Sequence, residues 1–166
     1  MLKLPFFSAI ATFFIGWSIS SQAVTESEVK AIASSSNQTQ LAKSVHRQVN
    51  QYRASLDLAP LEFNALISQQ AKIHSENMAQ GLVEFGHGGF EDRIEAVGNR
   101  ISYRSAAENV AYNQGHRDPV ATAVAGWIDS DGHRQNMVGN YNLTGIGVAT
   151  NPQGEYYFTQ IFILEN

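Results

Sequence analysis

The sequence predicts an α+β fold, because helical and strand patterns occupy different parts of the chain. Apolar residues recur every three or four positions up to about residue 132, and they alternate with polar residues between positions 146 and 162. Helices followed by antiparallel strands are typical of α+β proteins. The chain has no internal repeat with a period of 20 to 50 residues. The pattern therefore predicts one non-repetitive domain.

Residues 1–23 have the features of a secretory signal peptide. Lys3 precedes an apolar run from Leu4 to Ile19, and Ala23 provides a small residue at the expected cleavage point. We expect cleavage after Ala23, export to the periplasm or the medium, and no stable membrane span afterwards. An uncleaved membrane anchor is the alternative, since the run is close to the minimum of about 17 residues for a membrane span.

Residues 24–40 are polar and lack a sustained period, which predicts a flexible leader before a folded domain over residues 41–166. The first helix is expected from Leu41 and ends before Pro60. Its apolar stripe has steps of four, four, three and four residues. The stripe consists of Leu41, Val45, Val49, Tyr52 and Leu56.

Three further helices have recognisable ends. The second is expected from the N-cap Asn64 to Gly81, and a short third helix from about residue 91 to 97. Asp118 followed by Pro119 predicts the start of a fourth helix.

The strands are expected mainly near the end of the chain. Two alternating runs flank a loop over residues 151–154 that contains Pro and Gly, which predicts a β-hairpin. Residues 101–103 and 109–112 are candidates for further short strands.

The composition excludes several classes of protein. The 166 residues include 11 Lys and Arg against 15 Asp and Glu, for a net charge of −4. Scattered basic residues give no surface for nucleic acid, so we expect no nucleic-acid partner. The absence of cysteine excludes disulfides, thiolate ligands and a cysteine nucleophile. We expect a monomer.

Two histidines are candidate site residues because glycines flank them. His87 lies within residues 86–89, His133 follows Gly132, and Glu108 lies between them in the sequence. Glycine lets a ligand approach the backbone closely. Two imidazoles and one carboxylate are the ligands of an open zinc site with water in the fourth position. Alternatively, the two histidines only form hydrogen bonds in turns.

Two other residues have less specific signals. His74 lies on the apolar face of the second predicted helix, where a buried histidine with both nitrogens hydrogen-bonded is the more common situation. Ser130, three residues before His133, is a candidate nucleophile, although serine at such a position more often bonds a helix end.

Six segments of the chain, taken together and in their order along the sequence, resemble the CAP superfamily (cysteine-rich secretory, antigen 5 and pathogenesis-related proteins; SCP domain), and specifically its cysteine-poor bacterial branch. The resemblance covers about residues 43 to 164. The segments that carry it are Asn50–Arg53, Leu58–Leu61, Phe85–His87, Ala107–Val110, Trp127–Met137 and Tyr157–Phe162.

The resemblance implies a three-layer α-β-α sandwich, with a small antiparallel sheet between helices and a shallow cleft. In cysteine-rich members two His and two Glu describe this cleft and can hold a divalent ion such as zinc. His87 matches the first His and Glu108 the first Glu. Ser130 and Tyr157 stand where the second Glu and the second His are expected, and His133 belongs to the bacterial variant and is expected to face the same cleft. The implied metal ligands are His87, Glu108 and His133.

The resemblance favours an exported binding module whose cleft, including Tyr157, holds a divalent metal or a small polar ligand of unknown identity. The alternative is an extracellular hydrolase acting on cell-wall, peptide or ester substrates, through metal-activated water or a His/Glu acid–base pair. Its candidate catalytic residues are Glu108, His133 and Ser130. Lipid or sterol binding comes last, because Tyr103 is the only aromatic residue between positions 94 and 103. Glu108 and His87 could also have a purely structural role.

Overall fold

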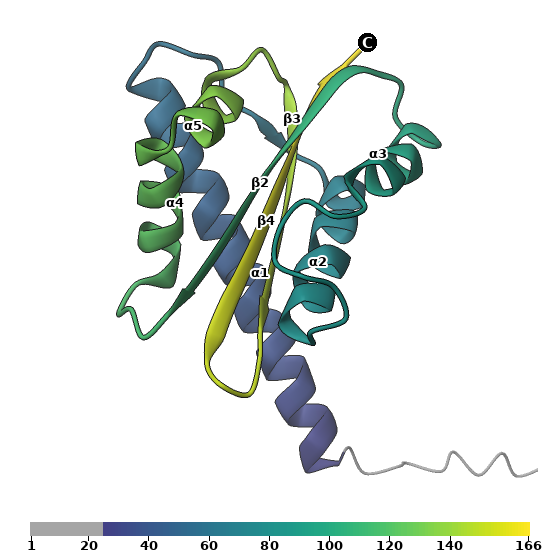
Figure 1. Cartoon of the computed structure of the whole chain (residues 1–166), viewed down its shortest axis with the longest axis vertical. Coiled ribbons are helices and arrows are strands. Elements are labelled where there is room, and N and C mark those ends of the chain that lie inside the picture. The colour runs from purple at the N-terminus through teal and green to yellow at the C-terminus, as the bar shows by residue number, and fades with distance from the viewer. Residues whose placement is uncertain (1–24) are drawn as a thin grey trace, which may run out of the picture.

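The computed structural model describes residues 25–166, which form three layers with a four-stranded sheet in the middle (Figure 1). The predicted signal peptide lies outside the described residues. The order of strands in the sheet is β1-β3-β4-β2. The elements in chain order are α1 (Glu26–Ala54), β1 (Glu62–Phe63), α2 (Ala65–Ala79), α3 (Phe90–Gly98), β2 (Tyr103–Gln114), α4 (Pro119–Asp129), α5 (Asp131–Val138), β3 (Leu143–Thr150) and β4 (Glu155–Glu165).

Each face of the sheet has its own hydrophobic core. The larger core packs α1, α4 and α5 against one face, with Trp127, Phe158 and Phe162 at its centre. The smaller core packs α2 and α3 against the other face, around Ile67 and Ile161. Figure 1 shows these two groups of helices on opposite sides of the strands. The fold is therefore the expected α+β sandwich.

Helix α2 lies directly on β3 because two glycines of that strand lack side chains. A Cβ atom built on Gly147 would lie 2.2 Å from the backbone nitrogen of Lys72, and one built on Gly145 would lie 2.2 Å from that of Ser68. Only glycine allows the two backbones to come so close. This contact fixes the position of α2, which carries one of the residues of the candidate site.

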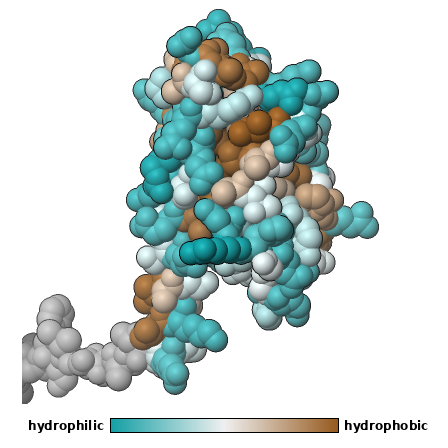
Figure 2. Space-filling view, turned by 90° about the vertical axis from the view of Figure 1, so that its left-hand side faces the viewer, coloured by the Kyte–Doolittle hydropathy of each residue, from teal (hydrophilic) through white to brown (hydrophobic). Residues whose placement is uncertain are grey.

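Helix α1 begins 15 residues earlier than the expected start at residue 41. Thr25 and Glu28 form a capping box that starts the helix at Glu26. The predicted flexible leader over residues 24–40 is thus helical from residue 26, and its first buried residue is Ala42. The sequence showed no period here because apolar side chains such as Val29 and Ile32 are exposed. Figure 2 shows exposed hydrophobic side chains on the part of the molecule next to the grey segment. The boundary of the domain at residue 41 stays a prediction.

Most of the other expected elements are confirmed. Asn64 caps α2, Asp118 caps α4 with Pro119 at its start, and β3 and β4 form the hairpin. Of the two short segments expected as strands, residues 109–112 lie within the single strand β2, whereas only Tyr103 of residues 101–103 belongs to it. None of the helices within residues 25–166 has an apolar stretch long enough to cross a membrane.

Two elements were not predicted. Helix α5 lies in a stretch for which no element was expected, and it gave no helical pattern because its sequence is polar and buries only Met137. Strand β1 has only two residues, and it pairs with β3 in parallel, through Glu62 with Leu143. The sheet is therefore mixed, and not purely antiparallel as predicted.

Candidate functional site

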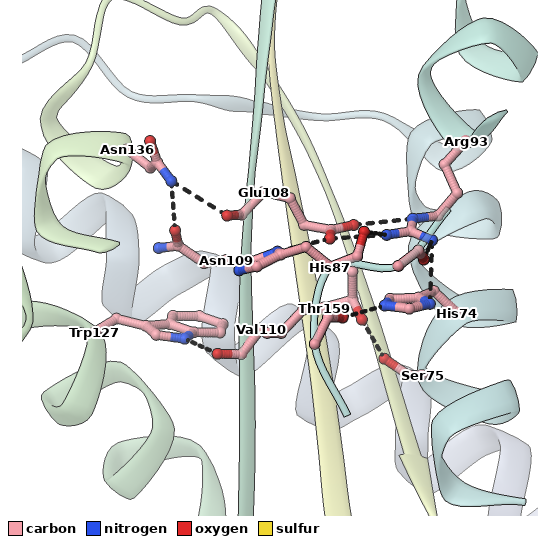
Figure 3. A network of polar contacts seen from close by, with 12 residues as sticks. His74, Ser75, His87, Arg93, Glu108, Asn109, Val110, Trp127, Asn136 and Thr159 are labelled. Carbon is pink, nitrogen blue, oxygen red and sulfur yellow. Dashed lines mark hydrogen bonds and ion pairs between the residues drawn. The ribbon is translucent and has the colours of Figure 1, made fainter. Parts of the chain in front are cut away.

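The candidate site is built around Glu108, whose carboxylate is almost fully buried on the edge strand β2. Only 2% of its side chain is exposed. Arg93 of α3 donates from Nε to Oε2 at 3.0 Å and from Nη2 to Oε1 at 2.8 Å, and His87 Nδ1 lies 3.0 Å from Oε1 (Figure 3). Such a two-point contact between guanidinium and carboxylate is a strong, directional ion pair. Glu108 is therefore held in one orientation.

Arg93 also holds the loop that carries His87. Its Nη1 donates to the carbonyl of Gly88 at 2.8 Å and to His74 Nδ1 at 3.2 Å. His74 Nε2 lies 2.8 Å from the carbonyl of Gly86. Because a carbonyl only accepts, the proton of His74 is on Nε2, and Nδ1 accepts from Arg93. His74 is 2% exposed. The expectation that His74 is a buried, hydrogen-bonded histidine is confirmed.

His87, which contacts Glu108, and His133 lie close together, but they come from different layers. Their ring centroids are 6.4 Å apart. Half of the His87 side chain is exposed, and its Nδ1 proton points to Glu108, which leaves Nε2 free for a ligand. Burial, helped by the charge of His87, lowers the pKa of His133. His133 lies on helix α5.

Amide side chains tie the second helical layer to the same stretch of β2. Asn109 Nδ2 donates to the carbonyl of His133 at 3.0 Å, and Asn136 Nδ2 donates to Asn109 Oδ1 at 2.9 Å and to the carbonyl of Glu108 at 3.2 Å. Trp127 Nε1 donates to the carbonyl of Val110 at 2.9 Å. Since neighbouring residues of a strand face opposite sides, Glu108 reaches α3 while Asn109 reaches α5.

The structure does not connect Ser130 or Tyr157 to this pair of histidines. Ser130 lies between α4 and α5, and its backbone carbonyl accepts from Arg134 N at 2.8 Å. Tyr157 belongs to an aromatic cluster with Tyr112, at a centroid distance of 5.2 Å, and donates to Glu155 Oε2 at 3.1 Å. Burial, with Glu155 nearby, raises the pKa of Tyr157.

The residue that sequence reasoning missed is Arg93. It follows Glu91 and Asp92 in what looks like a solvated, charged turn, yet it is 8% exposed. The available signal was its position four residues before Val97, a spacing that places both side chains on the same face of the helix.

The residues present do not fit the predicted three-ligand zinc centre. Within residues 25–166 no three His, Asp or Glu side chains form a group that could hold a metal ion. Both oxygens of Glu108 already accept from Arg93, and a cation at Glu108 would lie against the positive guanidinium. The set of His87, Glu108 and His133 thus lacks a free carboxylate.

Fold and site together define an α-β-α sandwich domain with two neighbouring imidazoles, one of which is hydrogen-bonded to a buried carboxylate on the edge strand of the sheet. Residues 46–162 match the CAP family, the Cysteine-rich secretory protein family. The chain belongs to this family.

The chain is similar to two proteins of Bacillus subtilis (strain 168). It is 33% identical over 149 residues to the "Uncharacterized membrane protein YlbC", covering 87% of this chain and 39% of that protein. It is 33% identical over 152 residues to the "Uncharacterized protein YkwD", covering 84% of this chain and 56% of that protein. The chain thus spans about half or less of the length of these relatives.

Among solved structures, the chain is similar to an extracellular protein containing a SCP domain from Bacillus anthracis. The sequence identity is 26%, the TM-score is 0.62, and the match covers 87% of this chain and 45% of that one.

Stability is expected to fall as the pH drops from about 7.5 to 5.5, because His74 must stay neutral in the folded protein. Burial, and to a smaller extent the charge of Arg93, lowers the pKa of His74. The unfolded chain takes up a proton near the ordinary value of about 6.5, so this contribution is complete above that pH and is lost below it. His133 acts in the same direction.

Urea denaturation at the two pH values measures this effect. The urea midpoint of the wild type should fall at the lower pH, and His74→Gln should reduce the fall. An unchanged fall in His74→Gln would assign the pH dependence to other groups.

Proposed function

We propose that the protein is an exported binding module whose imidazole pair, His87 and His133, binds a small polar ligand. The observation that carries this proposal is the hydrogen bond between Glu108 and His87. This bond fixes the tautomer of the half-exposed His87 imidazole and directs its Nε2 outward. The ring centroid of His87 lies 6.4 Å from that of His133. A preorganised pair loses little entropy when a ligand binds.

Export is supported by the pattern of residues 1–23 and by the similarity to an extracellular protein containing a SCP domain. Whether the N-terminal segment is cleaved belongs to the same proposal. Mass spectrometry of the mature protein from its host tests it, since cleavage after Ala23 predicts a chain that begins at Val24.

A thermal-shift screen of small carboxylates, amines, sugars and divalent cations tests the binding proposal. A ligand present at 100 times its Kd adds about 2.7 kcal/mol to the stability, which raises the melting temperature measurably. The shift should disappear in the double variant His87→Ala, His133→Ala. It should persist in His116→Ala, an exposed histidine outside the site. A shift that survives the double variant would place the ligand elsewhere.

A divalent cation is a separate outcome of the same experiment. With Glu108 bound to Arg93, only the two imidazoles would be free to hold it. Elemental mass spectrometry of the purified protein and of His87→Ala decides this point. If the purified protein contained stoichiometric zinc and His87→Ala did not, the ligand of the imidazole pair would be a metal ion and not a small polar molecule.

The same hydrogen bond supports hydrolysis as a second candidate function. A carboxylate that orients an imidazole is a common arrangement for a general base, and here Nε2 of His87 would take the proton of an attacking water. A panel of chromogenic esters, peptides and glycosides tests for turnover. His87→Gln should abolish turnover. The buried groups around Glu108 stay in place in this variant, because His87 is half exposed. Turnover retained in His87→Gln would exclude this mechanism.

A further inference from the structure

Three aromatic side chains form an exposed cluster outside the imidazole pair. Tyr112 of β2 and Tyr157 of β4 are direct neighbours in the antiparallel ladder, with ring centroids 5.2 Å apart. The loop between α2 and α3, which Figure 1 shows beside the strands, brings the ring of Phe85 to 6.2 Å from that of Tyr112. Phe85 is 54% exposed and Tyr112 is 44% exposed. We refer to these three residues as the aromatic cluster. Its rings are inclined to one another and not stacked, so ring surface stays open to solvent.

A carboxylate lies at the hydroxyl end of the aromatic cluster. The hydroxyl of Tyr112 donates to Glu155 Oε1 at 2.9 Å, and that of Tyr157 donates to Glu155 Oε2 at 3.1 Å. Asn151 Nδ2 also donates to Oε2, and its Oδ1 accepts from the main-chain N–H groups of Gln153 and Glu155, both at 3.1 Å. The turn between β3 and β4 therefore holds this carboxylate in place. The hydrogen bonds, above all the one from Asn151, lower the pKa of Glu155 and keep it ionised at neutral pH.

No cation of the neighbouring segments balances this charge. None of the ion pairs within residues 25–166 includes Glu155. The segments that build the aromatic cluster and its carboxylate, residues 82–86, 110–114 and 151–157, contain no Lys or Arg. The faces of aromatic rings are themselves negative, and a phenol that donates to a carboxylate is polarised further in this direction. The surface is therefore complementary to a cation.

The same hydrogen bonds favour a methylated ammonium over other small ligands. Both tyrosine hydroxyl protons are already donated to Glu155, so the aromatic cluster offers ring faces and acceptor oxygens but no hydroxyl proton. A sugar hydroxyl that needs a donor would find none on these three rings. A simple ammonium is strongly hydrated and gains little from an open ring surface. A quaternary ammonium is attracted by the ring faces and also buries its methyl groups against them.

We infer that the aromatic cluster binds a quaternary ammonium group of the choline type. The methylated nitrogen lies over the exposed faces of Phe85 and Tyr112, and Glu155 supplies the opposite charge. The inference goes beyond the proposed function, because it assigns a second site that does not use His87 or His133.

The first experiment compares choline with neopentylcarbinol, the alcohol in which a carbon atom replaces the charged nitrogen of choline. The two molecules have the same shape, so the difference in their binding measures the effect of the charge. In NMR titrations of ¹⁵N-labelled protein at constant ionic strength, choline should produce saturable shifts at Phe85, Tyr112 and Tyr157. The alcohol should bind at least about fivefold more weakly. The N-methyl protons of bound choline should move upfield, because they lie over aromatic rings.

Substitutions locate the site on the protein. Tyr112→Leu removes an exposed ring and Glu155→Gln removes the charge, so each should weaken choline binding at least about twofold, and the double variant should abolish saturable binding. Phe63→Leu is the matched control for the ring, since Phe63 is 39% exposed on β1, at the opposite edge of the sheet. Glu165→Gln is the matched control for the charge, since Glu165 is exposed on the same strand as Glu155. Both controls should bind choline as the wild type does.

Four results would overturn the inference. They are the absence of saturable shifts, equal binding of neopentylcarbinol, choline affinity retained in the double variant Tyr112→Leu, Glu155→Gln, and tighter binding of N-acetylglucosamine than of choline. Cosedimentation with phosphatidylcholine vesicles that free choline reverses would identify a lipid headgroup as the source of the ammonium. Binding of free choline without cosedimentation would identify a small solute.

The double variant His87→Ala, His133→Ala separates this inference from the proposed function. It should bind choline as the wild type does, although it loses the ligand of the imidazole pair. Loss of choline binding in this variant would assign choline to the imidazole pair and overturn the second site. A thermal-shift ligand that survives in this variant would contradict the proposed function alone.

Discussion

Gly147→Ala is expected to leave the protein without a stable fold. The new methyl group would lie 2.2 Å from the nitrogen of Lys72 and 2.4 Å from the carbonyl oxygen of Ala71, both in the backbone of α2. Backbone atoms cannot rotate away, so the helix would have to move off β3 and open the core around Ile67. We expect a loss of more than about 4 kcal/mol, which is exceptional for a single substitution and comparable to the whole stability of a marginally stable domain, about 5 kcal/mol.

Soluble yield and thermal melting followed by circular dichroism measure this loss. Gly132→Ala is the matched control, because a Cβ atom there meets nothing within 4 Å and the residue lies in helix α5. That variant should be as stable as the wild type, or up to about 1 kcal/mol more stable. A Gly147→Ala protein that melts within a few degrees of the wild type would mean that α2 is not in direct contact with β3.

The second large effect is expected for Arg93→Met, because it leaves the Glu108 carboxylate buried without its cation. Breaking a buried ion pair by removing one partner typically costs about 3–5 kcal/mol. Arg93 also donates to Gly88 and His74, so the loop that carries His87 loses its support at the same time. Arg93→Lys should be intermediate, since an ammonium cannot reproduce the planar two-point contact.

Urea denaturation of a double-mutant cycle measures this pair. The variant Arg93→Met, Glu108→Met carries no unpaired charge, so it should recover part of the stability lost in Arg93→Met. Arg100→Met is the control, because Arg100 is exposed in the neighbouring turn. If Arg93→Met were no less stable than Arg100→Met, the ion pair would not hold the site together.

The sequence was informative where a residue type has a local meaning. Asn64, Asp118 and Pro119 mark helix starts through bonds to residues two or three positions away, and these starts are confirmed. His87 and Glu108, which match two positions of the family pattern, are in contact, and their role in a binding site stays a prediction.

The rest depends on contacts between distant segments. The charge of Arg93 suggested an exposed side chain. Its partner Glu108 is known only from the packing of α3 against β2. Helix α5 has a polar sequence and is held by contacts such as that of Asn136 with Asn109, which lies 27 positions away. The periodicity of apolar residues along a segment gives no information about such long-range hydrogen bonds. His133, which the resemblance led us to expect in the same cleft as His87, lies near it, with ring centroids 6.4 Å apart, but the helix that carries it was not predicted.

The central place of β4 has a consequence for the order of events during synthesis. This strand is the last element in the chain, yet it pairs with both β2 and β3. Neither core can close until residues 155–165 have emerged, and the earlier helices remain without their partner surface until then. Formation of such long-range pairs is slow. If the protein is exported as proposed, its chain would thus stay unfolded during passage through the export channel, and His87, Glu108 and His133 would come together only after β4 has joined the sheet.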